Sequence, residues 1–437
     1  MGKSTMLAGG LLLLATLASA LPGQAQIQGL YYQEVEKDGR VYVFNTPERL
    51  KAWQASNDMG TAVSLIGRGP NGETIVGENE TAVDLYLFKH NLPAYDRPTP
   101  KPVVAPAFPK TTISGRAYAD FSSKENKDKG TGIKSSDSGV GIDFKRFYFT
   151  VNHDFDAVWS AQFQSDIGDQ GAKRYDVFVK KAFIQAKLSP AAIFRLGSAD
   201  TPWVPFAEGQ YGLRYFEQVI TDHLSFGTSA DWGIHFLGKV MNDKVGYQIS
   251  LVNGKGYSNP TRTKSMDIEG RLNFEPIKGL MFAVGGYSGK LGNDTDAVPA
   301  KHTATRTNAL VQYSNDMFKI GGEYFSAENW KTVTAVAADK TDGYSIWGQF
   351  YVDKQFSVFA RYDTAKPSKT LKPALEDKYY NLGLQYRFNK SLAGSLGYKH
   401  AEVKGGTLGT GNGTIGSTVA GRQGEYNEIG VWAIYEF

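Results

Sequence analysis

Residues 380–388 read YNLGLQYRF, and this short stretch carries the pattern that decides the fold. Tyr380, Leu382, Leu384 and Tyr386 are apolar or aromatic, while the residues between them are Asn, Gly and Gln. Strict alternation sends successive side chains to opposite faces of a β-strand. One face of this strand therefore suits an apolar environment, and the other suits water.

The same alternation recurs from residue 111 to residue 437. Sixteen such segments can be counted, starting near residues 112, 142, 157, 174, 191, 230, 244, 265, 279, 304, 317, 342, 356, 377, 391 and 425. Each is about ten residues long and is followed by a polar or Gly-rich connection, which is typical of a transmembrane β-barrel. A soluble β-sandwich also has alternating strands and is the alternative interpretation.

The connections between these segments distinguish the two interpretations, because short and long connections alternate along the sequence. Seven tight turns, such as 389–390, lie between eight longer loops, and the longest internal loop is 199–229. An up-and-down barrel with both termini in the periplasm requires this order, whereas a sandwich gives no reason for it. The expected fold is all-β: a 16-stranded antiparallel transmembrane β-barrel over residues 111–437, preceded by a small α+β periplasmic domain.

The first 25 residues have the composition of a signal peptide. Lys3 supplies a positive start and a Leu-rich run follows, with cleavage expected after Ala25 and 18–20 as the second choice. The less favoured alternative is an uncleaved anchor, since the apolar run falls short of the ~20 residues that span a bilayer. The sequence therefore predicts an exported protein.

Two more segments precede the barrel. Residues 26–91 mix strand and helix patterns, with strands at 62–66 and 73–76 around a Gly-Pro-Asn-Gly turn, and are expected to form the small periplasmic domain. Residues 92–110 contain six prolines, which predicts a stiff, extended linker. A domain boundary is expected in this linker.

Composition excludes several classes of protein. The 437 residues include no Cys, so disulfides, Cys-bound metals and thiol nucleophiles are excluded. The formal net charge is only +4, from 48 basic and 44 acidic residues, which gives no reason to expect a nucleic-acid partner. The six His belong to no recognisable catalytic motif. We expect no enzyme activity, no catalytic residues, no cofactor and no metal site.

The chain ends on Phe437, within the stretch 432–437 that reads WAIYEF. This resembles the terminal strand that outer-membrane assembly machinery recognises, so Phe437 is expected to act as the assembly signal. The expected location is the outer membrane of a Gram-negative bacterium, with the assembly machinery and membrane lipid as partners.

Part of the barrel resembles a known family. The residues concerned are FKRFYF at 144–149, YDVFV at 175–179, RLG at 195–197, TPW at 201–203 and WGIHF at 232–236. They are similar to the phosphate-selective porin O and P family. The resemblance implies a 16-stranded, water-filled channel that is usually a homotrimer, with its third loop folded inwards to narrow the pore.

A channel is also expected from the barrel alone, because sixteen strands enclose a lumen too wide for side chains to fill. Because side chains alternate along each strand, nine basic residues are expected to point into this lumen. These candidate pore-lining residues are Arg116, Arg146, Arg195, Lys239, Arg271, Lys319, Arg361, Arg387 and Lys399. Six acidic residues share it: Asp120, Asp166, Asp267, Glu269, Glu323 and Asp363. The excess of three positive charges predicts a weak anion preference, and a rim or barrel-wall ion pair is the alternative role for each basic residue.

The third loop supplies the candidate constriction, and packing on the rim or on a neighbouring subunit is its alternative role. Its candidate residues are Trp203, Phe206, Glu208, Tyr211, Arg214, Tyr215 and Glu217. The loop also contains Asp200 and Asp222, and this acidity departs from the concentrated Lys and Arg filter of the resembled family. The sequence therefore predicts a porin that passes small hydrophilic solutes and ions, with phosphate as one candidate.

A second function stays open beside the channel. The barrel could serve as a scaffold whose periplasmic domain docks a partner protein or an electron carrier through residues 26–110. The chain has no haem-attachment motif, so such a carrier would be a separate protein.

Overall fold

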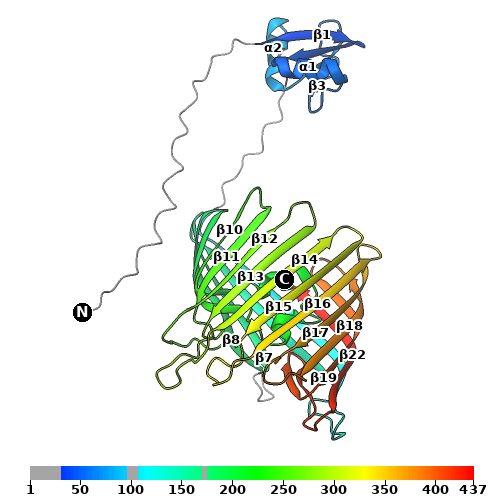
Figure 1. Cartoon of the computed structure of the whole chain (residues 1–437). Helices are drawn as coiled ribbons and strands as arrows, with labels where there is room; N and C mark the ends of the chain where they lie inside the picture. The colour runs from blue at the N-terminus through cyan, green and yellow to red at the C-terminus, as the bar shows by residue number, and fades with distance from the viewer. Residues whose placement is uncertain (1–30, 96–106, 170–174) are drawn as a thin grey trace, which may run out of the picture. The chain divides into compact units, whose positions relative to one another are not determined.

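The computed structural model describes residues 31–95, 107–169 and 175–437, and the chain divides into two compact units that meet in the sequence at residue 104 (Figure 1). The expected signal peptide and the centre of the expected linker lie outside the described residues. Within the described ranges, no helix is long and apolar enough to cross a membrane.

The first unit is a four-stranded sheet covered by two helices. Its elements are β1 (Gln33–Lys37), β2 (Arg40–Phe44), α1 (Pro47–Ser56), β3 (Val63–Leu65), β4 (Thr74–Gly77) and α2 (Glu80–Lys89). The sheet order is β1-β2-β4-β3, and β2 and β4 run parallel. The side chain of Asn79 begins α2 by accepting the N–H of Ala82 at 2.9 Å. Tyr86 and Leu87 of this helix pack against Val41 and Ile75.

The second unit is a closed antiparallel barrel of sixteen strands, which confirms the expected fold class. The strands are β5 (Lys110–Asp128), β6 (Gly139–Asp154), β7 (Trp159–Asp169), β8 (Tyr175–Ser189), β9 (Ala192–Asp200), β10 (Ala230–Val240), β11 (Val245–Val252), β12 (Asp267–Phe274), β13 (Leu280–Gly289), β14 (Ala304–Ser314), β15 (Phe318–Glu328), β16 (Lys340–Tyr351), β17 (Phe356–Lys366), β18 (Glu376–Arg387), β19 (Leu392–Lys404) and β22 (Gln423–Glu436). Every expected start lies within three residues of an observed one.

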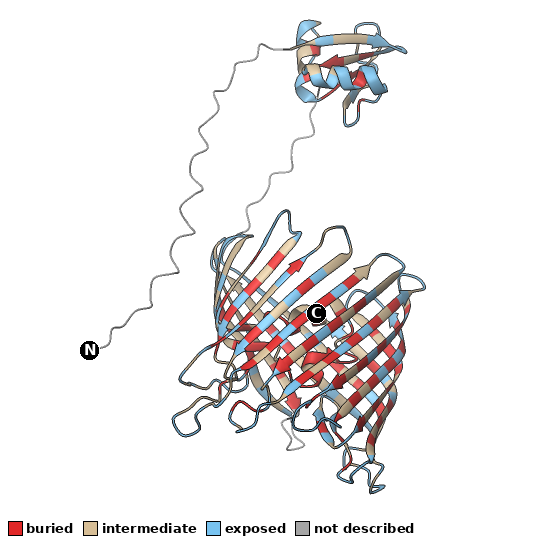
Figure 2. Cartoon of the chain, in the orientation of Figure 1, coloured by how far each residue is buried: buried red, intermediate tan, exposed pale blue. Residues whose placement is uncertain are grey.

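Alternation of side chains explains why these segments form the wall. Along β17 every second residue from Ser357 to Ala365 is buried inside the barrel, while Val358 and Tyr362 between them are exposed. Figure 2 shows the same alternation of buried and exposed residues on neighbouring strands. The outward side chains are mostly apolar, as a surface facing lipid requires.

The barrel closes where its last strand meets its first. β22 pairs with β5 from Gly424 opposite Asp128 to Glu436 opposite Arg116. Beyond this ladder, the backbones of Phe437 and Gly115 exchange two hydrogen bonds of 3.0 and 3.1 Å. The end of the chain is therefore part of the seam.

Two of the long loops contain short helices or strands of their own. The loop between β9 and β10 contains the helices α3 (Val204–Tyr211) and α4 (Ile220–His223). The loop between β19 and β22 contains a hairpin of β20 (Thr407–Thr410) and β21 (Gly413–Gly416).

Candidate functional site in the barrel lumen

The long loop between β9 and β10 lies inside the barrel. Trp203 donates from its indole nitrogen to Glu323 on β15 at 2.7 Å, and Gln385 on β18 donates to the Tyr215 hydroxyl at 2.8 Å. Arg306 on β14 donates to the backbone carbonyl of Phe226. These partners are inward side chains of the wall, so the loop crosses the lumen instead of resting on the rim.

The local sequence explains the backbone path of this loop. Pro205 stands in the first turn of α3, where its missing N–H costs nothing. Gly212 ends the helix with a φ of +80°, a left-handed conformation that glycine adopts most easily. A Cβ at Gly212 would lie 3.0 Å from the amine of Lys319, so this turn also lets the lysine approach the loop.

Most of the candidate constriction residues anchor the loop. Trp203, Tyr211 and Tyr215 are buried, and Phe206 packs against the same cluster. Wall residues complete this core inside the lumen, among them Tyr118, Tyr148, Leu310, Trp347, Phe359 and Trp432. The loop is therefore fixed to the wall by an apolar core as well as by hydrogen bonds.

An open cavity of about 410 Å³ lies between α3 and the wall formed by β5, β6, β7, β8, β18, β19 and β22. Its charged lining residues are Arg116, Lys180, Lys181, Arg214, Arg387 and Lys390 on the positive side, and Asp200, Glu208 and Glu436 on the negative side. Six basic groups thus face three acidic groups in one cavity. Of the nine predicted pore-lining residues, Arg116 and Arg387 are the two found here.

Each acidic group of the cavity is held in an ion pair. Asp200 binds Lys181 at 2.6 Å, Glu436 binds Arg116 at 2.5 Å, and Glu208 binds Arg214. In the part of the chain that the structure describes, no carboxylate pairs with Lys180, Arg387 or Lys390. The amine of Lys180 instead donates to the Tyr148 hydroxyl at 3.1 Å and lies 4.6 Å from the centre of that ring. The cavity therefore keeps three uncompensated positive charges.

Two β-bulges bring into the lumen basic residues that the alternation along the strands did not predict there. Against β5, the register of β6 shifts by one residue at Lys145, and against β7, the register of β8 shifts at Lys180. A bulge adds one residue and breaks the alternation. Lys145 therefore reaches Asp120 at 3.1 Å while its neighbour Arg146 binds Asp166 at 3.0 Å.

The second bulge has the same effect beside the cavity, since Lys180 and Lys181 are consecutive and both line it. The alternation along β8 is therefore broken at Lys180. A register shift leaves no signal of its own there, so Lys145, Lys180 and Lys181 were missed.

The other predicted pore-lining residues lie elsewhere in the lumen. Arg195 donates to Gln185 at 2.8 Å, and Arg271 donates to the Pro202 carbonyl at 2.8 Å. Arg361 and Lys399 are almost fully buried in ion pairs with Asp363 and Glu428. Lys239 stands at a tight turn, 63% exposed and 3.9 Å from Asp243. Barrel-wall ion pairs, the alternative role, therefore describe Arg361 and Lys399.

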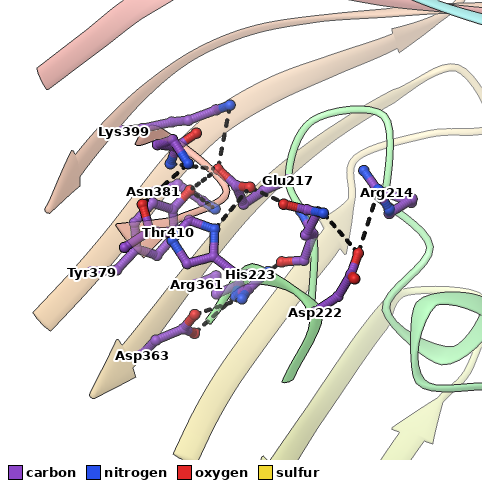
Figure 3. Close-up of polar contacts among 12 residues, drawn as sticks. Arg214, Glu217, Asp222, His223, Arg361, Asp363, Tyr379, Asn381, Lys399 and Thr410 are labelled. Atoms are coloured by element: carbon purple, nitrogen blue, oxygen red, sulfur yellow. Dashed lines mark hydrogen bonds and ion pairs between the residues drawn. The ribbon is translucent and has the colours of Figure 1, made fainter. Parts of the chain in front are cut away.

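Glu217 occupies the centre of a buried polar network (Figure 3). Its carboxylate accepts hydrogen bonds from the Tyr379 hydroxyl and the Asn412 amide, both at 3.1 Å. The amine of Lys399 lies 3.4 Å from it, and so does Nδ1 of His223. Glu217 is only 5% exposed, so the network neutralises the charge that the sequence alone would add to a constriction.

Residues 102–406 match the family model described as Gram-negative porin. No curated protein matches the chain in sequence.

Solved structures similar to the chain include a porin, an outer membrane protein and an outer membrane channel. The anion-selective porin from Comamonas acidovorans is 14% identical, with a TM-score of 0.55 over 75% of this chain and 99% of that chain. A loop L8 deletion mutant of OmpT, an outer membrane protein of Vibrio cholerae, is 15% identical, with a TM-score of 0.53 over 75% and 99%. The outer membrane channel DcaP of Acinetobacter baumannii is 10% identical, with a TM-score of 0.53 over 76% and 99%. At these identities the likeness concerns the fold.

Proposed function

The chain belongs to the Gram-negative porin family, and from this premise we propose that it is a passive channel for small hydrophilic solutes and ions with a weak preference for anions. Family and fold make it a β-barrel channel of the outer membrane. The anion preference, the path of the solute and the residues that set it are our proposal.

One observation carries the anion preference. Lys180, Arg387 and Lys390 line the cavity beside α3 without a carboxylate partner among the described residues, whereas Asp200, Glu208 and Glu436 are each paired. Fixed charges in a narrow, partly desolvated passage attract ions of the opposite sign and repel ions of the same sign. Three uncompensated cations therefore favour anions.

Phosphate is a candidate solute, without a dedicated site. The two arginines of the cavity that bind carboxylates, Arg116 and Arg214, are already engaged. A tight phosphate site needs several free donors converging on one anion. We propose that phosphate passes as other small anions do.

Planar-bilayer recording of the purified full-length protein tests the function. In a KCl gradient, the reversal potential should have the sign of chloride preference, and millimolar phosphate should reduce the chloride current little. A reversal potential of the opposite sign would overturn the anion assignment, and block at micromolar phosphate would show a tight site.

We also propose that the protein is a homotrimer. Four neighbouring strands, β15 to β18, carry the outward residues Tyr324, Tyr344, Tyr362 and Tyr380, as expected where aromatic side chains meet a lipid–water interface. The opposite sector, β6 to β9, exposes Ile142, Val177 and Leu196 together with the aromatic residues Phe144, Trp159, Phe163, Tyr175 and Phe194. This sector is the proposed contact between copies, and native gels of V177D, which should yield monomers, test it.

We propose the following division of the chain into segments. Residues 1–25 are proposed as the signal peptide, 26–91 as a periplasmic domain, 92–110 as the linker and 111–437 as the barrel. Phe437 is proposed as the signal read by the assembly machinery. The first unit exposes Phe88 and Ile66, 85% and 84% accessible, and these two side chains are where a periplasmic partner would bind.

A further inference from the structure

Part of the barrel lumen is filled by an apolar core. Ile220, Leu224 and Phe226 of the loop pack against the inward wall residues Phe325, Tyr379 and Ala401, and all six are fully or almost fully buried. Apolar packing of this kind holds no water. Ions therefore have no path on the side of the lumen next to β15, β18 and β19.

The hairpin β20–β21 belongs to this core. Leu408 and Ile415 point into it, 5% and 0% exposed, although they come from the loop before the last strand. The N–H of Gly411 at the hairpin tip donates to the carbonyl of His223 at 2.8 Å. The hairpin and α4 thus form one plug, made by two loops about 190 residues apart in sequence.

Glu217 joins both parts of the plug to the wall. Asn412 of the hairpin and His223 of α4 contact its carboxylate at 3.1 and 3.4 Å, and Tyr379 and Lys399 do so from β18 and β19. Figure 3 shows His223, Tyr379 and Lys399 converging on Glu217 from different elements. Within the described residues, this carboxylate is the point where the loop, the hairpin and two strands meet.

We propose that Glu217 is a positioning residue that holds the β20–β21 hairpin and α4 together as a seal, which confines ion flow to the basic cavity. The inference rests on the proposed channel function and names a residue that preserves the selectivity of the channel without contacting the ion. Loss of the contacts would release the hairpin and open the sealed part of the lumen. Ions would then also pass where Lys180 and Arg387 are distant.

The wall is expected to tolerate loss of the carboxylate. Lys399 keeps a second partner, Glu428, at 3.1 Å, so E217A would not leave this buried amine without a counter-charge. E217Q retains an oxygen that can accept from Tyr379 or Asn412, and it should restore part of the seal.

A second variant tests the seal without touching Glu217. Thr407 and Gly416 are paired across the hairpin, so removal of residues 408–415 joins two positions that already lie side by side. E125Q is the matched control: Glu125 forms an exposed ion pair with Lys134, at 40% and 55% side-chain exposure.

The experiment is bilayer recording of wild type, E217A, E217Q, the hairpin deletion and E217A combined with the deletion. E217A and the deletion should each raise single-channel conductance by about two-fold or more and bring the reversal potential nearer zero, with E217Q intermediate and E125Q unchanged. The combination should add little to either change, since both break one seal.

The outcomes distinguish failure of the channel function from failure of the seal. A wild type that passes no ions would overturn the channel function itself. A conducting wild type whose conductance and reversal potential survive in both E217A and the deletion would overturn the seal alone. Additive effects in the combined variant would show that Glu217 does not act through the hairpin.

Discussion

The ring of Phe437 lies directly over Gly115, where a Cβ would come within 2.2 Å of the ring and 2.9 Å of the Tyr148 carbonyl. The two residues also exchange backbone hydrogen bonds at the seam between the last strand and the first. The end of the chain is therefore fitted to a position that has no side chain.

This fit predicts that G115V hinders barrel closure. Overpacking of a tight contact costs about 1–3 kcal/mol. The folded fraction should fall, as seen by gels in which unheated barrels migrate differently from boiled ones. In F437A/G115V the clash with the ring is gone but that with Tyr148 remains, so partial recovery is expected. Full assembly of G115V would show that the close approach is unimportant.

The cavity predicts that K180E weakens the anion preference. Reversal of one of three uncompensated charges should lower the anion-to-cation permeability ratio roughly two-fold or more. K239E is the control, because Lys239 is exposed at a tight turn beside Asp243. Equal shifts in both variants would mean that charge anywhere on the lumen face matters equally.

Ionic strength should control the same preference. The Debye length is about 10 Å at 0.1 M salt and about 3 Å at 1 M, so exposed cavity charges act over a shorter range as salt rises. Reversal potentials at a constant concentration ratio should move towards zero between these conditions. A preference that is constant from 0.1 to 1 M would point to dehydrated binding instead of a diffuse field.

Buried and open arginines should respond differently to charge reversal. Arg146 pairs with Asp166, whose side chain is inaccessible to solvent, so R146E would bury two carboxylates together. Loss of one partner of a buried pair costs about 3–5 kcal/mol. R146E should therefore reduce folded protein, whereas R387E should fold normally. Urea unfolding followed by gel migration checks this, and similar midpoints would contradict it.

The first unit should lose stability in acid. Burial favours the neutral form of the Glu34 carboxyl, but hydrogen bonds from Tyr32, His90 and Lys89 outweigh this and hold its pKa below the usual value. A carboxyl whose pKa is lower in the folded state stabilises that state above its unfolded pKa of about 4.3, and this stabilisation disappears as pH falls through the folded value.

Limited proteolysis of the full chain measures this effect. An acid-active protease should cut within residues 31–95 faster at pH 3 than at pH 5, while the barrel stays intact. E34Q should be cut faster than wild type at pH 5, and the difference should shrink at pH 3. Equal cutting at pH 5 would contradict the assigned role of Glu34.

The wall could be predicted from sequence because its pattern is local. Each strand shows a two-residue period, and the order of short and long connections gives the topology. Strand β1 was not predicted, since its sequence QEVEK is mostly charged and it buries no side chain. Its place in the sheet depends on pairing with β2.

The site could be predicted only in part, because its geometry depends on long-range contacts. Arg116 and Arg387 lie on regular strands, and both line the cavity beside α3. Lys180 depends on a register shift, and the neutralisation of Glu217 depends on Lys399 and Asn412, which follow it by more than 180 residues. No local pattern records such contacts.

Because of the two bulges, the number of residues in a strand helps to determine which ions the channel prefers. Deletion of a single codon within β8 would restore its alternation and carry one of two adjacent lysines from the lumen to the lipid-facing side. Such a change would alter the charge of the passage with no amino-acid replacement at all. In related genes, in-frame insertions and deletions at these two positions would therefore be a route by which the preferred ion changes during evolution.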